Sequence, residues 1–142
     1  MKGITELWRA GEAPAWDGLF RADGSARAVE VDSAALSWFE LGAPLDFEMW
    51  LAENPETLTS IDIHPQGLAE IPDGSGYVCC GDGSHGSEGF FARLDRDKNP
   101  VWVVSLGDSN PFVRATVEGS MATFTNNLGN SITVDLADPD FA

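Results

Sequence analysis

Alternating apolar and polar residues dominate the second half of the chain and predict β-strands. In residues 131–136, Ile, Val and Leu occupy every second position, with Ser, Thr and Asp between them. Residues 112–117 and 121–125 alternate in a similar way. A period of two places successive side chains on opposite faces of a strand. In residues 101–106 five of the six side chains are apolar, which predicts a strand buried on both faces.

Short polar turns separate these predicted strands. Gly119 and Gly129 tolerate the positive φ of tight turns, as does Asn127, and residues 95–100 form another polar connection. Strands that follow one another through short turns pair antiparallel. The chain from about Tyr77 onward therefore predicts an antiparallel β-meander.

The first 76 residues are less regular. A turn at 23–24 and a strand at 26–31 are predicted, then two short strands at 59–64 and 67–71, with a break at 65–67. Residues 32–42 fit two interpretations. A helix would be capped by Asp32 or Ser33 and end at Gly42, whereas a strand would place Leu36 and Trp38 on one face.

The clearest helix prediction is residues 44–54. Pro44 suits a first turn, acidic residues stand near the positive end of the helix, and Pro55 prevents its continuation. Leu45, Met49 and Ala52 would then share one face. The predicted fold class is α+β and strand-dominated, with an antiparallel β-meander in the C-terminal half and one or two short helices in the N-terminal half. At 142 residues, the chain is expected to form a single domain, 1–142.

Negative charge is the strongest feature of the composition. There are 23 acidic residues against eight Lys and Arg, for a formal net charge of −15. Between Arg27 and Arg93 there are twelve acidic residues and no Lys or Arg. Such a surface disfavours nucleic acid and anionic membranes, and it fits either solubility in a crowded or saline cytoplasm or binding of a cationic protein partner. No apolar run suggests a membrane span or a signal peptide, and two adjacent cysteines make no disulfide framework, so a cytoplasmic location is expected.

Residues 77–91, YVCCGDGSHGSEGFF, concentrate chemically versatile side chains. The glycines at 81, 83 and 86 match G-x-G-x-x-G, but Gly89 and a returning strand stand where a nucleotide site needs a helix. In a strand, Cys79 and Cys80 point to opposite faces and are expected to be packed as small apolar residues. No nucleophile–base pair is evident, so no catalytic residue, metal or cofactor is predicted. Three side chains of the loop at 81–89 remain as reserve contacts for a partner: Asp82, His85 and Glu88.

The segment RATVEGSMATFTNNLGNSITVDL, residues 114–136, together with the size and acidity of the chain, resembles the strand-rich cores of immunity proteins from bacterial polymorphic toxin systems. This resemblance implies a non-enzymatic inhibitor that offers carboxylates to a basic, nuclease-like cognate toxin; it assigns no individual residue. The density of acids around the predicted helix suggests the binding surface. The candidate partner-binding residues are Glu40, Asp46, Glu48, Trp50, Glu53 and Glu56.

Three structural outcomes separate this hypothesis from its alternatives. An inhibitor predicts an exposed, contiguous acidic face. A small-ligand-binding or hydrolytic domain that uses residues 81–89 predicts a cleft where His85 and several carboxylates converge. An accessory domain whose acidity serves only solubility predicts evenly scattered acids. Trp50 likewise has two interpretations. It is either a core residue or an exposed partner contact surrounded by carboxylates.

Overall fold

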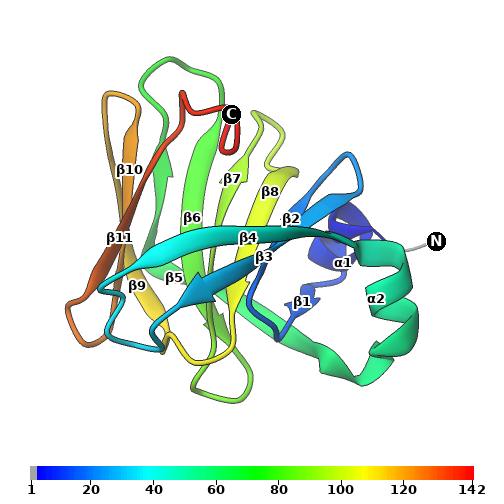
Figure 1. Cartoon of the computed structure of the whole chain (residues 1–142). Coiled ribbons are helices and arrows are strands. Elements are labelled where there is room, and N and C mark those ends of the chain that lie inside the picture. The colour runs from blue at the N-terminus through cyan, green and yellow to red at the C-terminus, as the bar shows by residue number, and fades with distance from the viewer. Residues whose placement is uncertain (1–2) are drawn as a thin grey trace.

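A computed structural model describes residues 3–142, which fold into two antiparallel sheets and two short helices (Figure 1). The large sheet has the order β1-β5-β6-β7-β8-β2-β3-β4, and the small sheet has the order β11-β10-β9. The strands of the large sheet are β1 (Glu12–Pro14), β2 (Gly18–Arg21), β3 (Ser25–Val31), β4 (Phe39–Asp46), β5 (Leu58–Glu70), β6 (Tyr77–Gly83), β7 (Gly89–Leu94) and β8 (Pro100–Leu106). The remaining elements are β9 (Phe112–Glu118), β10 (Met121–Asn126), β11 (Ser131–Asp135), helices α1 (Ile4–Arg9) and α2 (Phe47–Glu53), and a 3₁₀ turn at Pro55–Thr57.

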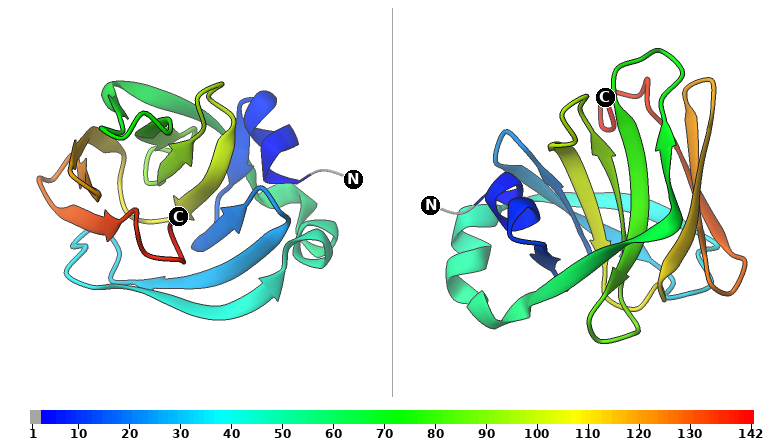
Figure 2. Two further views of the ribbon diagram at one scale, coloured as in Figure 1. Left: turned by 90° about the horizontal axis from the view of Figure 1, so that it is seen from above. Right: turned by 180° about the vertical axis from the view of Figure 1, so that it is seen from behind.

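The large sheet curls, and the small sheet lies beside β5 and beside the β3–β4 connection (Figure 2). Apolar side chains fill the space between the two sheets, because alternate residues of both point inward. This inner core includes Val78, Cys80, Phe91, Trp102 and Val104 from the large sheet, and Ala115, Phe124, Ile132 and Val134 from the small one. A second core covers the outer face of the large sheet beneath α1 and α2 and includes Ile4, Leu7, Phe20, Phe47, Cys79, Phe90 and Val103.

The predicted fold class is confirmed. The chain is strand-dominated and antiparallel, and both α-helices lie in its N-terminal half. The meander that follows Tyr77 divides between two sheets, because residues 107–111 carry the chain from β8 in the large sheet to β9 in the small one. The prediction for residues 101–106 also holds, since β8 supplies side chains to both cores.

The predicted helix at 44–54 is present but begins later. The Asp46 carboxylate accepts a hydrogen bond from the Met49 amide at 3.0 Å and caps α2, whereas Pro44 and the residue after it belong to β4. This start turns Phe47, Trp50 and Leu51 toward the core. The face predicted from Leu45, Met49 and Ala52 is therefore wrong, and Met49 is 59% exposed.

Two other predictions in this half need correction. Residues 32–38 form turns in which Ser33 and Leu36 have positive φ, and the strand begins only at Phe39. The strands predicted at 59–64 and 67–71 are one strand, β5, whose register with β6 shifts between Ile63 and Leu68. Helix α1 and strands β1 and β2 were not predicted, because each is too short to show a period. In the part of the chain that the structure describes, no helix has the length and apolar character needed to cross a membrane.

Candidate functional site

Four connections meet at one end of the molecule, at the bottom of Figure 1, and together form a surface that we call the loop face. They are the residues between β3 and β4, β6 and β7, β8 and β9, and β10 and β11, namely 32–38, 84–88, 107–111 and 127–130. The antiparallel order brings these connections to the same end. Exposed loops held on a rigid sheet are common sites of recognition, so this end is a natural candidate.

Long-range hydrogen bonds join these loops into one platform. The Asn126 amide is almost fully buried and donates to the carbonyl oxygens of Ala34 and Ser109, both at 2.9 Å. The backbone amide of Asn110 donates to the Ser87 carbonyl at 2.8 Å. Each of these bonds ties together loops that are far apart in sequence. The loop face is consequently held in one arrangement before any partner binds.

The loop face and the adjoining strand ends are acidic. None of its four segments contains Lys or Arg, whereas Asp32, Glu88 and Asp108 belong to it. Next to it, Glu30 of β3 lies directly opposite Glu40 of β4 in the antiparallel register, and both side chains are exposed. Like charges directly opposite in a sheet destabilise it. This end of the molecule therefore carries negative charge that no Lys or Arg of its four segments offsets.

Internal ion pairs neutralise little of the acidity. Within residues 3–142, the pairs between Lys or Arg and a carboxylate all involve Asp140, which lies 3.4 Å from Arg21 and 3.2 Å from Arg27. Arg93 is also engaged near the C-terminal segment, where it donates to the carbonyl oxygens of Leu136 and Phe141. These arginines hold the end of the chain, and Arg21 and Arg27 pair with Asp140 and not with a carboxylate of the loop face.

Trp38 is the large aromatic side chain that the loop face exposes, with 48% of its surface accessible. The Asp32 carboxylate accepts hydrogen bonds from the backbone amides of Ser37 at 2.9 Å and Trp38 at 3.3 Å, and so fixes the end of the turn. The hydrogen bond from the Ser37 hydroxyl holds the pKa of Asp32 below its ordinary value. Sequence reasoning missed Trp38 as a candidate contact, because its exposure depends on where the turn ends.

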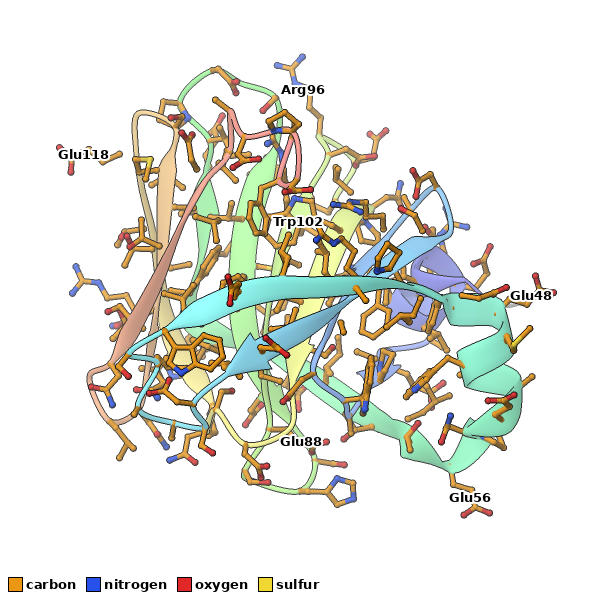
Figure 3. All side chains as sticks on the ribbon, in the orientation of Figure 1. Glu48, Glu56, Glu88, Arg96, Trp102 and Glu118 are labelled. Carbon is orange, nitrogen blue, oxygen red and sulfur yellow. The ribbon has the colours of Figure 1, made fainter. Side chains whose placement is uncertain are left out.

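The acids predicted to bind a partner do not form one patch. Glu40 lies near the loop face, whereas Asp46 ends β4 and is used as the cap of α2. The six residue steps between them span roughly 20 Å of strand. Glu48, Glu53 and Glu56 are exposed along α2 and the following turn, and Figure 3 shows Glu48 and Glu56 pointing away from the molecule. We call this second group the helix flank.

Trp50 packs onto the core. Its ring centroid is 5.2 Å from that of Trp16, 6.2 Å from Phe47 and 6.3 Å from Phe20, and the side chain is half-buried. Of the two interpretations of Trp50, the core placement is the one observed. An exposed tryptophan among carboxylates does occur in this protein, but it is Trp38.

Two of the three reserve contacts, His85 and Glu88, lie in the β6–β7 loop and touch each other. Glu88 is only 5% exposed, and its Oε1 accepts from the Thr59 hydroxyl at 3.2 Å, the His85 amide at 2.9 Å and His85 Nδ1 at 2.9 Å. Asp82 lies apart from them and faces Asp62 across β5 and β6. The cavity beside Glu88 measures about 10 Å³, which is room for a single water-sized group and not for a substrate.

The two cysteines lie on opposite faces of β6, as predicted, with Cys79 in the outer core and Cys80 in the inner core. Both are free thiols. Burial raises the pKa of Cys80 to about 12, and it raises the pKa of Cys79 as well. Since the thiolate is the nucleophile and the metal ligand, neither side chain is suited to those roles at neutral pH.

This burial makes a direct prediction about thiol reactivity. In the native protein neither cysteine should react with Ellman's reagent at pH 8, because the thiols are inaccessible and protonated. In denaturant both should react, giving two thiols per chain. Rapid native labelling would show that β6 opens readily, and would contradict the packing described above.

Within residues 3–142, no three His, Cys, Asp or Glu side chains are grouped closely enough to hold a metal ion. A larger hollow of about 380 Å³ lies at the end opposite the loop face, between Ile71, Arg93 and Leu136. It is mostly apolar and contains none of the predicted site residues. Comparison of the chain with protein-family models, curated proteins and solved structures finds no match.

Proposed function

We propose that this protein is a non-enzymatic inhibitor of the immunity type, which binds a basic cognate protein through the loop face. The observation that carries the proposal is that the four segments of the loop face contain no Lys or Arg and adjoin the facing carboxylates of Glu30 and Glu40. A nuclease-like toxin presents a cationic cleft to its substrate phosphates, and carboxylates are the groups that complement such a cleft.

Besides charge, two further features of the loop face favour binding: its loops are held in place, and it exposes the aromatic side chain of Trp38. The buried Asn126 bonds and the Asp32 turn hold the loops in place, so that little conformational entropy is lost on binding. Trp38 supplies the kind of side chain that dominates binding energy at the centre of interfaces, and its ring face attracts arginine guanidinium groups. The facing carboxylates of Glu30 and Glu40 would gain stability when a cation comes between them.

The ligand-binding and hydrolytic alternative gains no support from residues 81–89. The cysteines there are buried and have raised pKa values, and the cavity beside Glu88 is too small for a substrate. The solubility alternative predicts that every exposed acid contributes equally to association with a cationic partner. That difference makes the proposal testable with matched sets of substitutions.

Three variants, each with three carboxylates neutralised, separate these possibilities. The loop-face variant changes Asp108 and the two acids of the adjoining strand ends, and is Glu30→Gln, Glu40→Gln and Asp108→Asn. The helix-flank variant is Glu48→Gln, Glu53→Gln and Glu56→Gln. A control at the opposite end is Glu70→Gln, Asp97→Asn and Glu118→Gln, all exposed positions. The partner tested is the basic C-terminal domain of a toxin encoded beside this gene, and association is measured by stopped-flow or surface plasmon resonance at several salt concentrations.

The loop-face variant should associate about tenfold more slowly than the unchanged protein and depend less on salt, because steering charge has been removed. The control should change the rate by less than about twofold. A larger effect of the helix-flank variant would move the interface to α2, whereas equal effects of all three would support a general charge effect. If no basic partner is found beside the gene or by capture from the native cell, the proposal fails.

A further inference from the structure

Two polar side-chain atoms are buried without a partner at the cavity beside the β6–β7 loop. Glu88 Oε2 and Ser105 Oγ have no hydrogen-bond partner within residues 3–142, although their residues are only 5% and 3% exposed. Glu88 Oε1, by contrast, accepts three hydrogen bonds. A buried carboxylate oxygen or hydroxyl left unpaired is costly, so folded proteins almost always give such atoms a partner.

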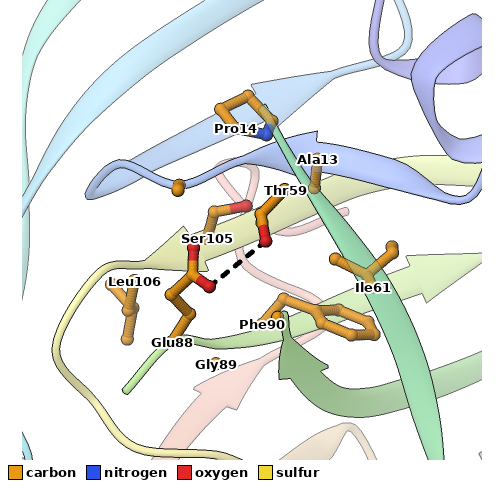
Figure 4. A pocket seen from close by; sticks show the side chains of 11 residues that line it. Ala13, Pro14, Thr59, Ile61, Glu88, Gly89, Phe90, Ser105 and Leu106 are labelled. Atoms are coloured by element: carbon orange, nitrogen blue, oxygen red, sulfur yellow. Dashed lines mark hydrogen bonds between the residues drawn. The ribbon is translucent and has the colours of Figure 1, made fainter. Parts of the chain in front are cut away.

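Both atoms line the same small cavity. It is lined by residues of β1, β5, β7 and β8 together with the loop, and Figure 4 shows the side chains of Glu88, Ser105 and Thr59 directed toward one another across it. The volume of about 10 Å³ holds one water-sized group. The rest of its wall is largely apolar, including Ala13, Ile61 and Phe90.

The chemistry of the two atoms restricts what can bind there. An ionised carboxylate oxygen only accepts hydrogen bonds, whereas a serine hydroxyl both donates and accepts. A single group that satisfies both atoms donates to Glu88 Oε2 and also exchanges a hydrogen bond with Ser105 Oγ. Water meets both requirements and fits the volume. We infer that this cavity is a binding site for one ordered water molecule, which bridges Glu88 and Ser105.

The water completes the anchorage of a carboxylate that positions His85. Ser84 and Thr59 extend the network, since the Thr59 hydroxyl lies 2.8 Å from that of Ser84 and accepts from the Ser84 amide at 3.0 Å. Because Glu88 Oε1 accepts, His85 carries its proton on Nδ1, 2.9 Å away. In the neutral imidazole the other ring nitrogen is then an acceptor, and the side chain is 69% exposed. The water, Glu88 and His85 thus form one unit that presents a fixed acceptor at the loop face.

A crystal structure at a resolution that shows ordered water tests the site directly. The expected result is one density peak at hydrogen-bond distance, about 2.6–3.2 Å, from both Glu88 Oε2 and Ser105 Oγ. Glu88→Gln should keep the peak, because an amide in place of Oε2 can donate to the same water. Ser105→Val should lose it, since the added methyl groups fill the cavity.

Two measurements in solution distinguish a water that supports the Glu88–His85 contact from side chains that are merely packed together. In Ser105→Val the midpoint of thermal unfolding should fall by roughly 3–6 °C, whereas the same change at the exposed Ser60 of β5 should leave it nearly unchanged. The ¹⁵N chemical shifts of His85 should report the Nδ1-protonated form in the original protein and a mixture in Ser105→Val. The inference is overturned if the peak is missing, if it has the many short oxygen contacts of a metal cation, or if Ser105→Val leaves the His85 tautomer unchanged. Each of these results is independent of whether a toxin partner exists.

Discussion

Replacing Phe91 with alanine is expected to lower the free energy of unfolding by about 3–5 kcal/mol. The side chain is fully buried on β7 and joins the two sheets. Its ring stacks on Phe124 of the small sheet with centroids 4.4 Å apart, and Phe112 meets it edge-on at 5.4 Å. Trp102 is a further edge-on neighbour at 6.0 Å. Alanine would remove all of these contacts and leave a cavity that rigid strands on both sides cannot close.

Urea denaturation followed by tryptophan fluorescence measures this loss. Phe91→Leu, which keeps most of the volume, should cost less than about 2 kcal/mol. Met121→Ala, at an exposed position in β10, should change stability by no more than about 0.5 kcal/mol. If Phe91→Ala cost as little as Met121→Ala, the two sheets could not be packed through this ring.

The parts of the fold that the sequence predicted are those in which one physical pattern repeats several times. β9 and β11 bury one face each, so apolar and polar residues alternate along them. The helix prediction at 44–54 found α2 but placed its start too early. Pro44 is equally acceptable in an edge strand such as β4, and only the hydrogen bond between Asp46 and Met49 defines where the helix begins.

The candidate site was less predictable, because it is assembled from distant segments. The amides of Asn126 and Asn130 both donate to the Ala34 carbonyl, and nothing in the local sequence indicates a bond across more than 90 residues. The β3–β4 turn that these bonds stabilise contains two non-glycine residues with positive φ, which local propensity disfavours. The exposure of Trp38 follows from that turn. Acidity was evident from composition, but its distribution over the surface required the strand order.

The glycines between residues 81 and 89 match the G-x-G-x-x-G pattern, but most of them are explained by close packing. A Cβ added at Gly83 would lie 2.5 Å from Glu88 Oε1, so glycine there leaves room for the buried carboxylate. Gly89 has a comparable role, since its Cβ would lie 2.4 Å from the Asn110 carbonyl oxygen. Spacing that is typical of a phosphate-binding loop thus arises here from close contacts at Gly81, Gly83 and Gly89 and from a positive φ at Gly86.

Gly81→Ala is therefore expected to destabilise the protein by about 3 kcal/mol or more, which is at the upper end of overpacking effects. An ideal Cβ at this position would lie 1.8 Å from the backbone oxygen of Asp62 and 2.9 Å from the Phe90 ring. The first neighbour is backbone of the adjoining strand β5, so it cannot move aside as a flexible side chain could. Relief would require β5 and β6 to separate where Asp62 and Asp82 already face each other.

Gly107→Ala is the matched control for this prediction. Its Cβ would have no neighbour closer than 3.8 Å, and the hydrogen bond from its amide to Asp17 would remain. Alanine there should be neutral or stabilising by up to about 1 kcal/mol, because it reduces the entropy of the unfolded chain. Urea denaturation of both variants measures the difference directly. If Gly81→Ala were as stable as Gly107→Ala, the close approach of β5 to β6 would be wrong, and the glycines of this segment would need another explanation.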